Sequence, residues 1–295
     1  MRKLSVLEKH GFNGLNRWPG NTQLESAEAV SDYFMHGYAP PTPLITKNTK
    51  ITAFGSCFAG NVSRYLLKKG YQVNAHSWDH NQSDLIRIDE IMVHTPALLA
   101  QFEWAFNDKP LGSVFIGSAE EKAQTYHSME ACKQIIKETD FFIITLGLTE
   151  AWYDKESEQY LWKFVPNRRL DPSRFESRFV SFSENLENLR RIYNLIKCNV
   201  PDAKVLFTLS PIPLLGSYHG KSVVAANTAS KATLRAVLHE FLSQKEHADA
   251  LYFPSYELVN NYIESPWKED NRHITPETVE TIMSIFDEYY MSANE

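Results

Sequence analysis

Three residues of the types that cleave or transfer acyl groups occur in the order Ser, Asp, His along this chain. Ser56 lies in the stretch Gly55-Ser56-Cys57, and Asp270 and His273 stand three residues apart near the C-terminal end. A serine hydroxyl needs a base to remove its proton, and a carboxylate can hold the histidine ring that does so. The sequence therefore predicts that Ser56 attacks a substrate, that His273 accepts its proton, and that Asp270 orients the ring.

Further polar residues follow the apolar runs that we expect to form the sheet, at the strand ends where open parallel sheets build their sites. Gly55 permits a tight turn, and backbone N–H groups at the start of the helix that follows could bind an oxyanion. The candidate oxyanion or substrate-binding residues are Gly55, Cys57, Gly147, Thr149, Glu150 and Ser210. Cys57 is also a chemically competent nucleophile, but its place one residue into the helix favours an inward, inert side chain.

Hydrophobic patterning predicts the elements that must position these residues. Apolar runs of strand length predict strands over residues 50–54, 71–75, 141–146, 204–209 and 250–253. Helical spacing and capping signals predict helices over residues 58–69, 96–106, 119–138, 181–199 and 222–244, and one that begins at 276. A strand, a tight turn, a helix and a strand in this order are typical of an α/β domain with a parallel sheet.

The domain organisation predicted from these patterns has two parts. Residues 1–48, rich in Asn, Gly and Pro, are expected to form an N-terminal extension that packs on the core. Residues 49–295 are expected to form one α/β domain, with an aromatic and charged insertion at about residues 151–180. A chain of 295 residues is long enough to bury a large core.

Composition narrows the class of protein. The formal net charge is −6 and hydrophobic residues make up 43%, which gives no general attraction to nucleic acid or to anionic membranes. The sequence shows no signal peptide and no apolar run of membrane-spanning length. Its three cysteines are widely spaced and form neither a disulfide framework nor a zinc motif. We therefore expect a cytoplasmic protein without a cofactor or a metal.

The stretch Phe54-Gly55-Ser56-Cys57-Phe58-Ala59 resembles the signature of the GSCFA family, which is grouped with the SGNH (GDSL-like) hydrolases. Further stretches resemble that family in the same order, and the likeness runs from about residue 49 to residue 290. These stretches are 145–152, 209–213, 229–231, 252–257 and 270–277. The resemblance implies a three-layer α/β/α sandwich with a mostly parallel, flavodoxin-like sheet. It also implies Ser56 as the nucleophile, with Asp270 and His273 activating it.

The chain departs from the SGNH pattern at the oxyanion hole. SGNH enzymes usually contribute an asparagine side chain from a Gly-x-Asn block, and Thr149 of Gly147-Leu148-Thr149 stands at that place here. The stretch 90–95 likewise lacks the Gly-Asn pair that GSCFA relatives often carry there. The family resemblance implies a serine esterase or O-acyltransferase that acts on O-acyl, for example acetyl, esters of a glycan, a sugar or a similar polyol. The alternative is a non-catalytic glycan-binding or assembly module on the same scaffold, which the missing asparagine favours.

Two other features have residue types that could bind a ligand. His76, Asp79 and His80 are residue types that bind metals, but their spacing supplies no third or fourth ligand of defined geometry, so a solvated loop is the favoured interpretation. The aromatic residues of the insertion either stack on sugar rings or pack the insertion itself; they are Trp152, Tyr153, Tyr160, Trp162 and Phe164. The sequence does not determine the oligomeric state.

Overall fold

The computed structural model describes residues 16–55, 57–74, 93–109, 133–161, 170–220 and 222–292, and of Cys57 only the backbone. Contacts within the chain separate it into two units, residues 1–39 and 40–295. The first unit contains the short helix α2 (Asn21–Leu24) and a π-helical turn over Val30–Phe34. The second contains the sheets and the remaining helices. The predicted packing of residues 1–48 on the core stays a prediction.

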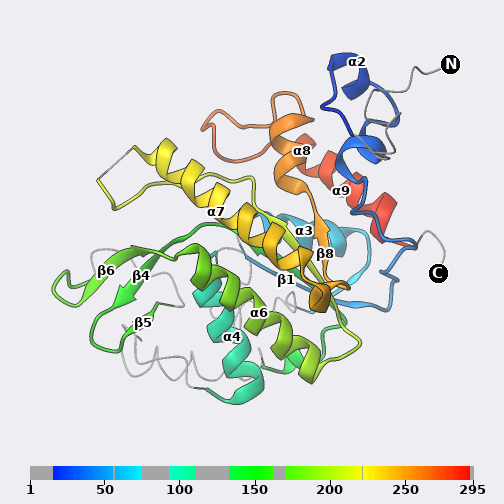
Figure 1. Ribbon diagram of the computed structural model, residues 1–295. Coiled ribbons are helices and arrows are strands. Elements are labelled where there is room, and N and C mark those ends of the chain that lie inside the picture. Colours follow the sequence, from blue (N-terminus) through cyan, green and yellow to red (C-terminus); the bar gives the residue numbers. More distant parts are fainter. Residues whose placement is uncertain are drawn as a thin grey trace, which may run out of the picture. The chain divides into compact units, whose positions relative to one another are not determined.

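A five-stranded parallel sheet forms the centre of the second unit, in the order β2-β1-β3-β7-β8 (Figure 1). Its strands are β1 (Lys50–Phe54), β2 (Gln72–Val73), β3 (Phe141–Leu146), β7 (Lys204–Leu209) and β8 (Leu251–Phe253). Numbered along the chain within this sheet, the order is 2-1-3-4-5, as in flavodoxin-like folds. The order reverses between β1 and β3, and ligands of open α/β sheets bind beyond the carboxyl ends of the strands at such a reversal.

Helices cover both faces of this sheet. One layer contains α4 (Thr95–Asn107), α6 (Phe182–Asn199) and α7 (Val223–Ser243), which contribute to one hydrophobic core with the strands. The other contains α3 (Cys57–Lys68) and α9 (Pro276–Tyr290), with the short α8 (Ser255–Asn261) packed against α9 (Figure 1). The protein is therefore a three-layer α/β/α sandwich.

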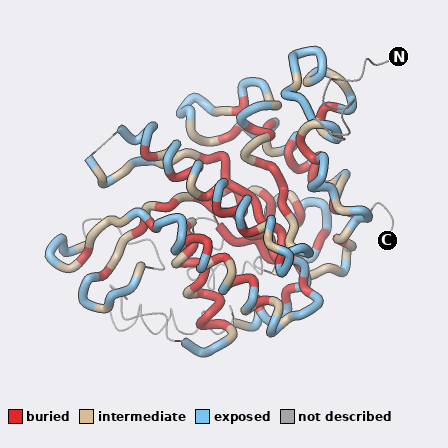
Figure 2. Tube along the Cα trace, viewed as in Figure 1, coloured by how far each residue is buried: buried red, intermediate tan, exposed pale blue. Residues whose placement is uncertain are grey.

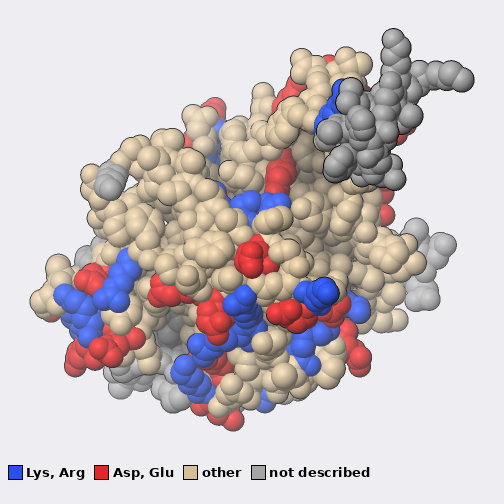
Figure 3. Space-filling view, in the orientation of Figure 1, with Lys and Arg blue, Asp and Glu red and all other residues tan. Residues whose placement is uncertain are grey.

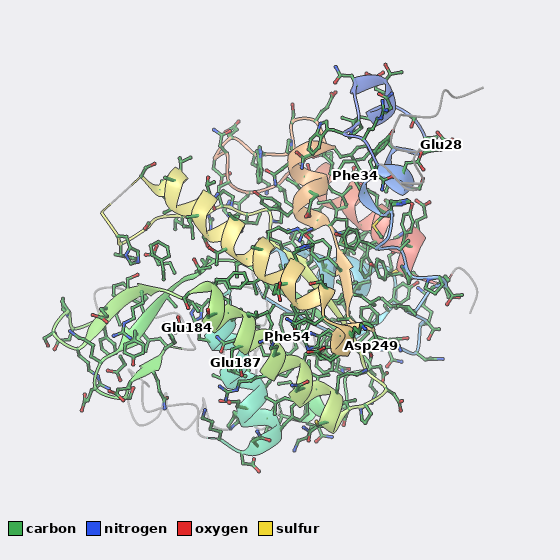
Figure 4. All side chains as sticks on the ribbon, in the orientation of Figure 1. Glu28, Phe34, Phe54, Glu184, Glu187 and Asp249 are labelled. Carbon is green, nitrogen blue, oxygen red and sulfur yellow. The ribbon has the colours of Figure 1, made fainter. Side chains whose placement is uncertain are left out.

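The central strands are the most buried part of this sandwich (Figure 2). All six residues of β3 are buried, as a parallel strand with helices on both faces requires. Phe54, the last residue of β1, is 1% exposed, and its ring packs 5.1 Å from that of Phe102 on α4 (Figure 4). This packing fixes the C-terminal end of β1, and the predicted nucleophile comes two residues later in the sequence.

A smaller antiparallel sheet lies in the region predicted as an insertion. It contains β4 (Glu150–Asp154), β5 (Gln159–Tyr160) and β6 (Phe175–Phe179), in the order β5-β4-β6. Arg174 donates two hydrogen bonds of 2.7 Å to the fully buried Asp154. These bonds hold the pKa of Asp154 well below its usual range. Side chains of both signs are interleaved over the lower half of the face in Figure 3, where α6 and this sheet lie in Figure 1.

The structure confirms most of the predicted elements. The strands expected at 50–54, 141–146 and 204–209 occur with those bounds. Ser181 and Glu184 form the expected capping box at the start of α6, and Thr275 caps α9 with Pro276 at its first position. The expected strand at 71–75 is shorter, and α8 was not predicted. Of the helix expected at 119–138, only residues from 133 onward are described.

No helix within the described ranges is both long and apolar enough to cross a membrane.

Candidate functional site

The turn after β1 is built on Gly55. Its φ is +136°, and a Cβ placed on it would lie 2.2 Å from the backbone oxygen of Thr145 on β3. Only glycine fits this conformation and this approach. Helix α3 begins at Cys57, so Ser56 lies between the end of β1 and the start of α3, outside the described residues.

Asp270 and His273 form a hydrogen-bonded pair in the loop that precedes α9. The Oδ2 atom of Asp270 lies 2.5 Å from Nδ1 of His273. The other carboxylate oxygen accepts the backbone N–H of His273 at 2.9 Å and that of Arg272 at 3.0 Å. These bonds, the backbone N–H of His273 first, hold the pKa of Asp270 well below its usual range. One ionised carboxylate thus fixes both the backbone of the loop and the imidazole ring.

Arg272 contacts the opposite nitrogen of the same ring. Its Nη1 lies 3.0 Å from Nε2 of His273, and its Nε donates to the carbonyl oxygen of Pro213 at 3.1 Å. Because a guanidinium can only donate, this contact is a hydrogen bond in the tautomer whose Nε2 accepts and whose Nδ1 proton faces Asp270. A neutral imidazole in this tautomer has the form that a general base requires.

The segment after β3 is held by buried side chains from α7. Ser230 accepts the backbone N–H of Thr149 at 2.8 Å. Lys231, which is 2% exposed, donates to the carbonyl oxygens of Gly147 and Ser210, each at 2.7 Å. The Ser-Lys pair in the 229–231 stretch therefore ties together the carboxyl ends of β3 and β7.

Several backbone N–H groups of the candidate oxyanion residues already have acceptors. The N–H of Gly147 donates to the carbonyl oxygen of Val93 at 2.9 Å, and that of Ser210 donates to Leu146 at 2.8 Å. The N–H of Thr149 is bound to Ser230, as described above. Thr149 and Ser210 are themselves buried. The first N–H groups of α3, which a helix leaves without intrahelical acceptors, are therefore the better source of oxyanion donors.

Glu150 occupies a different place, at the start of β4 in the small sheet. Its Oε1 accepts the backbone N–H of Tyr218 at 2.8 Å and the hydroxyl of Ser177 at 3.0 Å. Its Oε2 is buried and has no hydrogen-bond partner among the described residues. Within the described ranges, Glu150 thus joins the segment after β7 to the small sheet and makes no contact with the Asp270–His273 pair.

A cavity of about 510 Å³ opens beside His273. Asn61, Arg64, Tyr65 and Lys68 line it from α3, and Lys268 and Glu280 line it from the loop and helix around His273. His273 and helix α3, which begins directly after Ser56 in the sequence, therefore line the same cavity. Sequence reasoning missed these α3 residues, although their spacing of three, one and three places them on one helical face.

No group of three or more His, Cys, Asp or Glu side chains with the arrangement of a metal site occurs among the described residues. His76, Asp79 and His80 lie outside them, as do Trp162 and Phe164. Trp152 and Tyr218 pack their rings 4.8 Å apart, and Tyr153 packs 5.2 Å from Tyr160. Tyr153 and Tyr160 thus pack on each other within the insertion, and Trp152 packs on the segment that follows β7.

The fold and the candidate site define an α/β protein with an Asp–His pair beside the helix that follows the first strand. The chain belongs to the GSCFA family, whose model matches residues 50–286. No curated protein matches it.

One solved structure similar to the chain is an acetyl esterase mutant crystallised with an acetate ion. It has 11% sequence identity and a TM-score of 0.32, and the match covers 80% of this chain and 93% of that chain. Another is a carbohydrate esterase family 3 from Talaromyces cellulolyticus, with 12% identity and a TM-score of 0.33, and the match covers 81% of this chain and 94% of that chain. These TM-scores are low, so the fold assignment rests on the strand order and the layers.

Proposed function

We propose that this protein is a serine esterase or O-acyltransferase with Ser56 as the nucleophile. The observation that carries the proposal is the Asp270–His273 pair, with Oδ2 and Nδ1 2.5 Å apart, because His273 lines the cavity that α3 also lines. A histidine held by a carboxylate beside a serine at a helix start is the arrangement that activates a serine hydroxyl.

In the proposed reaction, Ser56 Oγ attacks the acyl carbonyl and His273 Nε2 takes the hydroxyl proton. The tetrahedral oxyanion is bound by N–H groups at the start of α3, where the helix dipole also favours negative charge. The C–O bond to the alcohol breaks, and the alcohol leaves with the proton from His273. Water or an acceptor hydroxyl then attacks the acyl-enzyme through the same base, which returns a proton to Ser56.

Hydrolysis and transfer differ only in which hydroxyl resolves the acyl-enzyme. The glycan or polyol ester substrate belongs to this proposal on the strength of the motif resemblance. The cytoplasmic setting belongs to it on the strength of the N-terminal sequence and the cysteine spacing.

Turnover of 4-nitrophenyl acetate tests the proposal. We expect the wild-type chain to hydrolyse it and Ser56→Ala to lose at least about 10³-fold in rate, because a missing nucleophile leaves only binding and oxyanion stabilisation. A fluorophosphonate should label the wild type at Ser56, and mapping of the labelled peptide separates Ser56 from the neighbouring Cys57. Labelling that survives in Ser56→Ala, or equal turnover by the two proteins, would refute the assignment.

A further inference from the structure

The cavity beside His273 carries an excess of positive charge. Of the described residues that line it, three are cationic, Arg64, Lys68 and Lys268, and one is a carboxylate, Glu280. The whole chain, in contrast, has a formal net charge of −6. A concave site whose charge is opposite to that of the whole protein attracts ligands of the opposite sign to that one place.

Among the described residues, no acid forms an ion pair with any of the three cations. Arg64 donates to the amide oxygen of Asn61 at 2.6 Å. Neither Arg64, Lys68 nor Lys268 forms an ion pair with any described residue, whereas cations on other surfaces, such as Lys197 with Asp249, do. Unpaired guanidinium and ammonium groups in a cavity remain able to bind carboxylate or phosphate oxygens.

Two acids on the segments that line the cavity, Asp270 and Asp287, have partners of their own. Asp270 accepts hydrogen bonds from the ring and the backbone of His273. Asp287 on α9 accepts the hydroxyl of Tyr65 at 2.6 Å and lies 3.8 Å from Lys69. Among the described lining residues, Glu280 is the one acid that opposes the three cations.

The position of the cations relates them to the proposed reaction. Arg64 and Lys68 lie on the face of α3 that begins one turn after Cys57, and Lys268 lies five residues before His273. His273 lines the same cavity, so a ligand that extends across it can contact both His273 and these cations.

We propose that the ester acted on at this site carries an anionic group, a carboxylate or a phosphate, that Arg64, Lys68 and Lys268 bind. This inference rests on the proposed function for the identity of the site, and it names the substrate class: an anionic ester of a polyol or acid, in place of a neutral one. The cavity volume of about 510 Å³ leaves room for such a group beside the acyl chain.

Binding to the full-length Ser56→Ala protein tests this inference without any need for turnover. Isothermal titration calorimetry at low salt would compare glycerol 1-phosphate, glycerate and neutral glycerol. We expect both anions to bind at least tenfold more tightly than glycerol, and the preference between them identifies phosphate or carboxylate. Added NaCl should weaken the binding of the anions and leave that of glycerol unchanged.

The variant Arg64→Gln/Lys268→Gln removes two charges from the cavity. We expect it to weaken the binding of the anions at least tenfold. The matched control, Lys204→Gln/Lys245→Gln, removes the same charge away from the cavity: Lys204 begins β7 at the amino edge of the sheet, and Lys245 follows α7. Lys68→Gln alone gives a second, milder variant, and circular dichroism confirms folding.

Glycerol binding as tight as that of the anions, or equal loss in the cavity and control variants, would overturn the inference. Either result leaves the esterase proposal standing, since that is decided by turnover and by labelling of Ser56. Conversely, anion binding by a chain that shows no turnover would support a cationic site and contradict only the proposed function.

Discussion

Nη1 of Arg272 lies 3.0 Å from Nε2 of His273, on the side of the ring opposite the one held by Asp270. In the proposed reaction, this nitrogen receives the proton of Ser56. In that reaction Arg272 and the serine hydroxyl would compete as donors to one acceptor, so Arg272 would have to leave Nε2 before the base acts.

Replacement of Arg272 tests this competition. We expect Arg272→Met to raise the rate of fluorophosphonate labelling at Ser56 up to about tenfold, because a hydrogen bond to a charged donor contributes about 1.5 kcal/mol that must otherwise be broken. The measurement is the second-order labelling rate at fixed pH, with Arg190→Met as a control on the remote helix α6. A slower rate in Arg272→Met would indicate that Arg272 stabilises the reaction itself.

Asp270→Asn tests the orienting role of the carboxylate. The amide oxygen of Asn can still accept the backbone N–H groups of Arg272 and His273, so the loop should keep its fold. The amide cannot accept the Nδ1 proton in the same way and disfavours the required tautomer. We expect kcat to fall about 10²- to 10⁴-fold. Glu269→Gln, which changes an adjacent exposed acid, serves as the control. Retention of full activity in Asp270→Asn would remove Asp270 from the mechanism.

Gly55→Ala tests the turn that precedes Ser56. The added methyl group would meet the backbone oxygen of Thr145 at 2.2 Å, in a residue with a φ of +136°. We expect the free energy of unfolding to fall by about 3 kcal/mol, from backbone strain plus the clash, and labelling of Ser56 to be lost.

The control for this turn is Gly70→Ala, since Gly70 has a φ of +79° and no atom within 4 Å of its added Cβ. There only the conformational penalty remains, about 1 kcal/mol. Urea denaturation of both variants gives the comparison. Equal losses of stability would mean that the contact with Thr145 does not constrain the turn.

His94 predicts a pH dependence of stability. It is buried at the start of α4, its Nδ1 accepts the backbone N–H of Ala97, and burial lowers its pKa to about 4. The unfolded chain takes up a proton here near its ordinary pKa of about 6.5. Between these values the unfolded state binds more protons, so stability falls as pH falls from about 6.5 to about 4, by on the order of 3 kcal/mol.

The variant His94→Asn separates this effect from other titrations, because Asn can cap α4 but does not ionise. Urea denaturation across pH 4–7 should show a shallower decline in His94→Asn than in the wild type. Parallel pH profiles for the two proteins would mean that His94 does not carry the dependence.

The sequence predicted the central strands well for a local reason. Phe141–Leu146 and Lys204–Leu209 are short apolar runs with β-favouring residues, and burial on both faces needs no information from elsewhere in the chain. The capping signals of Ser181 and Thr275 are equally local. The small sheet was not predicted as strands, because β4 and β6 pair across about twenty intervening residues and each is only partly buried.

By itself the sequence determined the residue types of a serine, a histidine and a carboxylate, the order in which they occur, and the strand-to-helix turn at Gly55. Tertiary structure decided what surrounds them, because the relevant contacts join segments far apart in the chain. Lys231 reaches Gly147 and Ser210, and the polar face of α3 meets the His273 loop. The positive charge beside the proposed base depends on this contact between α3 and the His273 loop. No local sequence pattern predicts that Arg64 and Lys268 line one cavity.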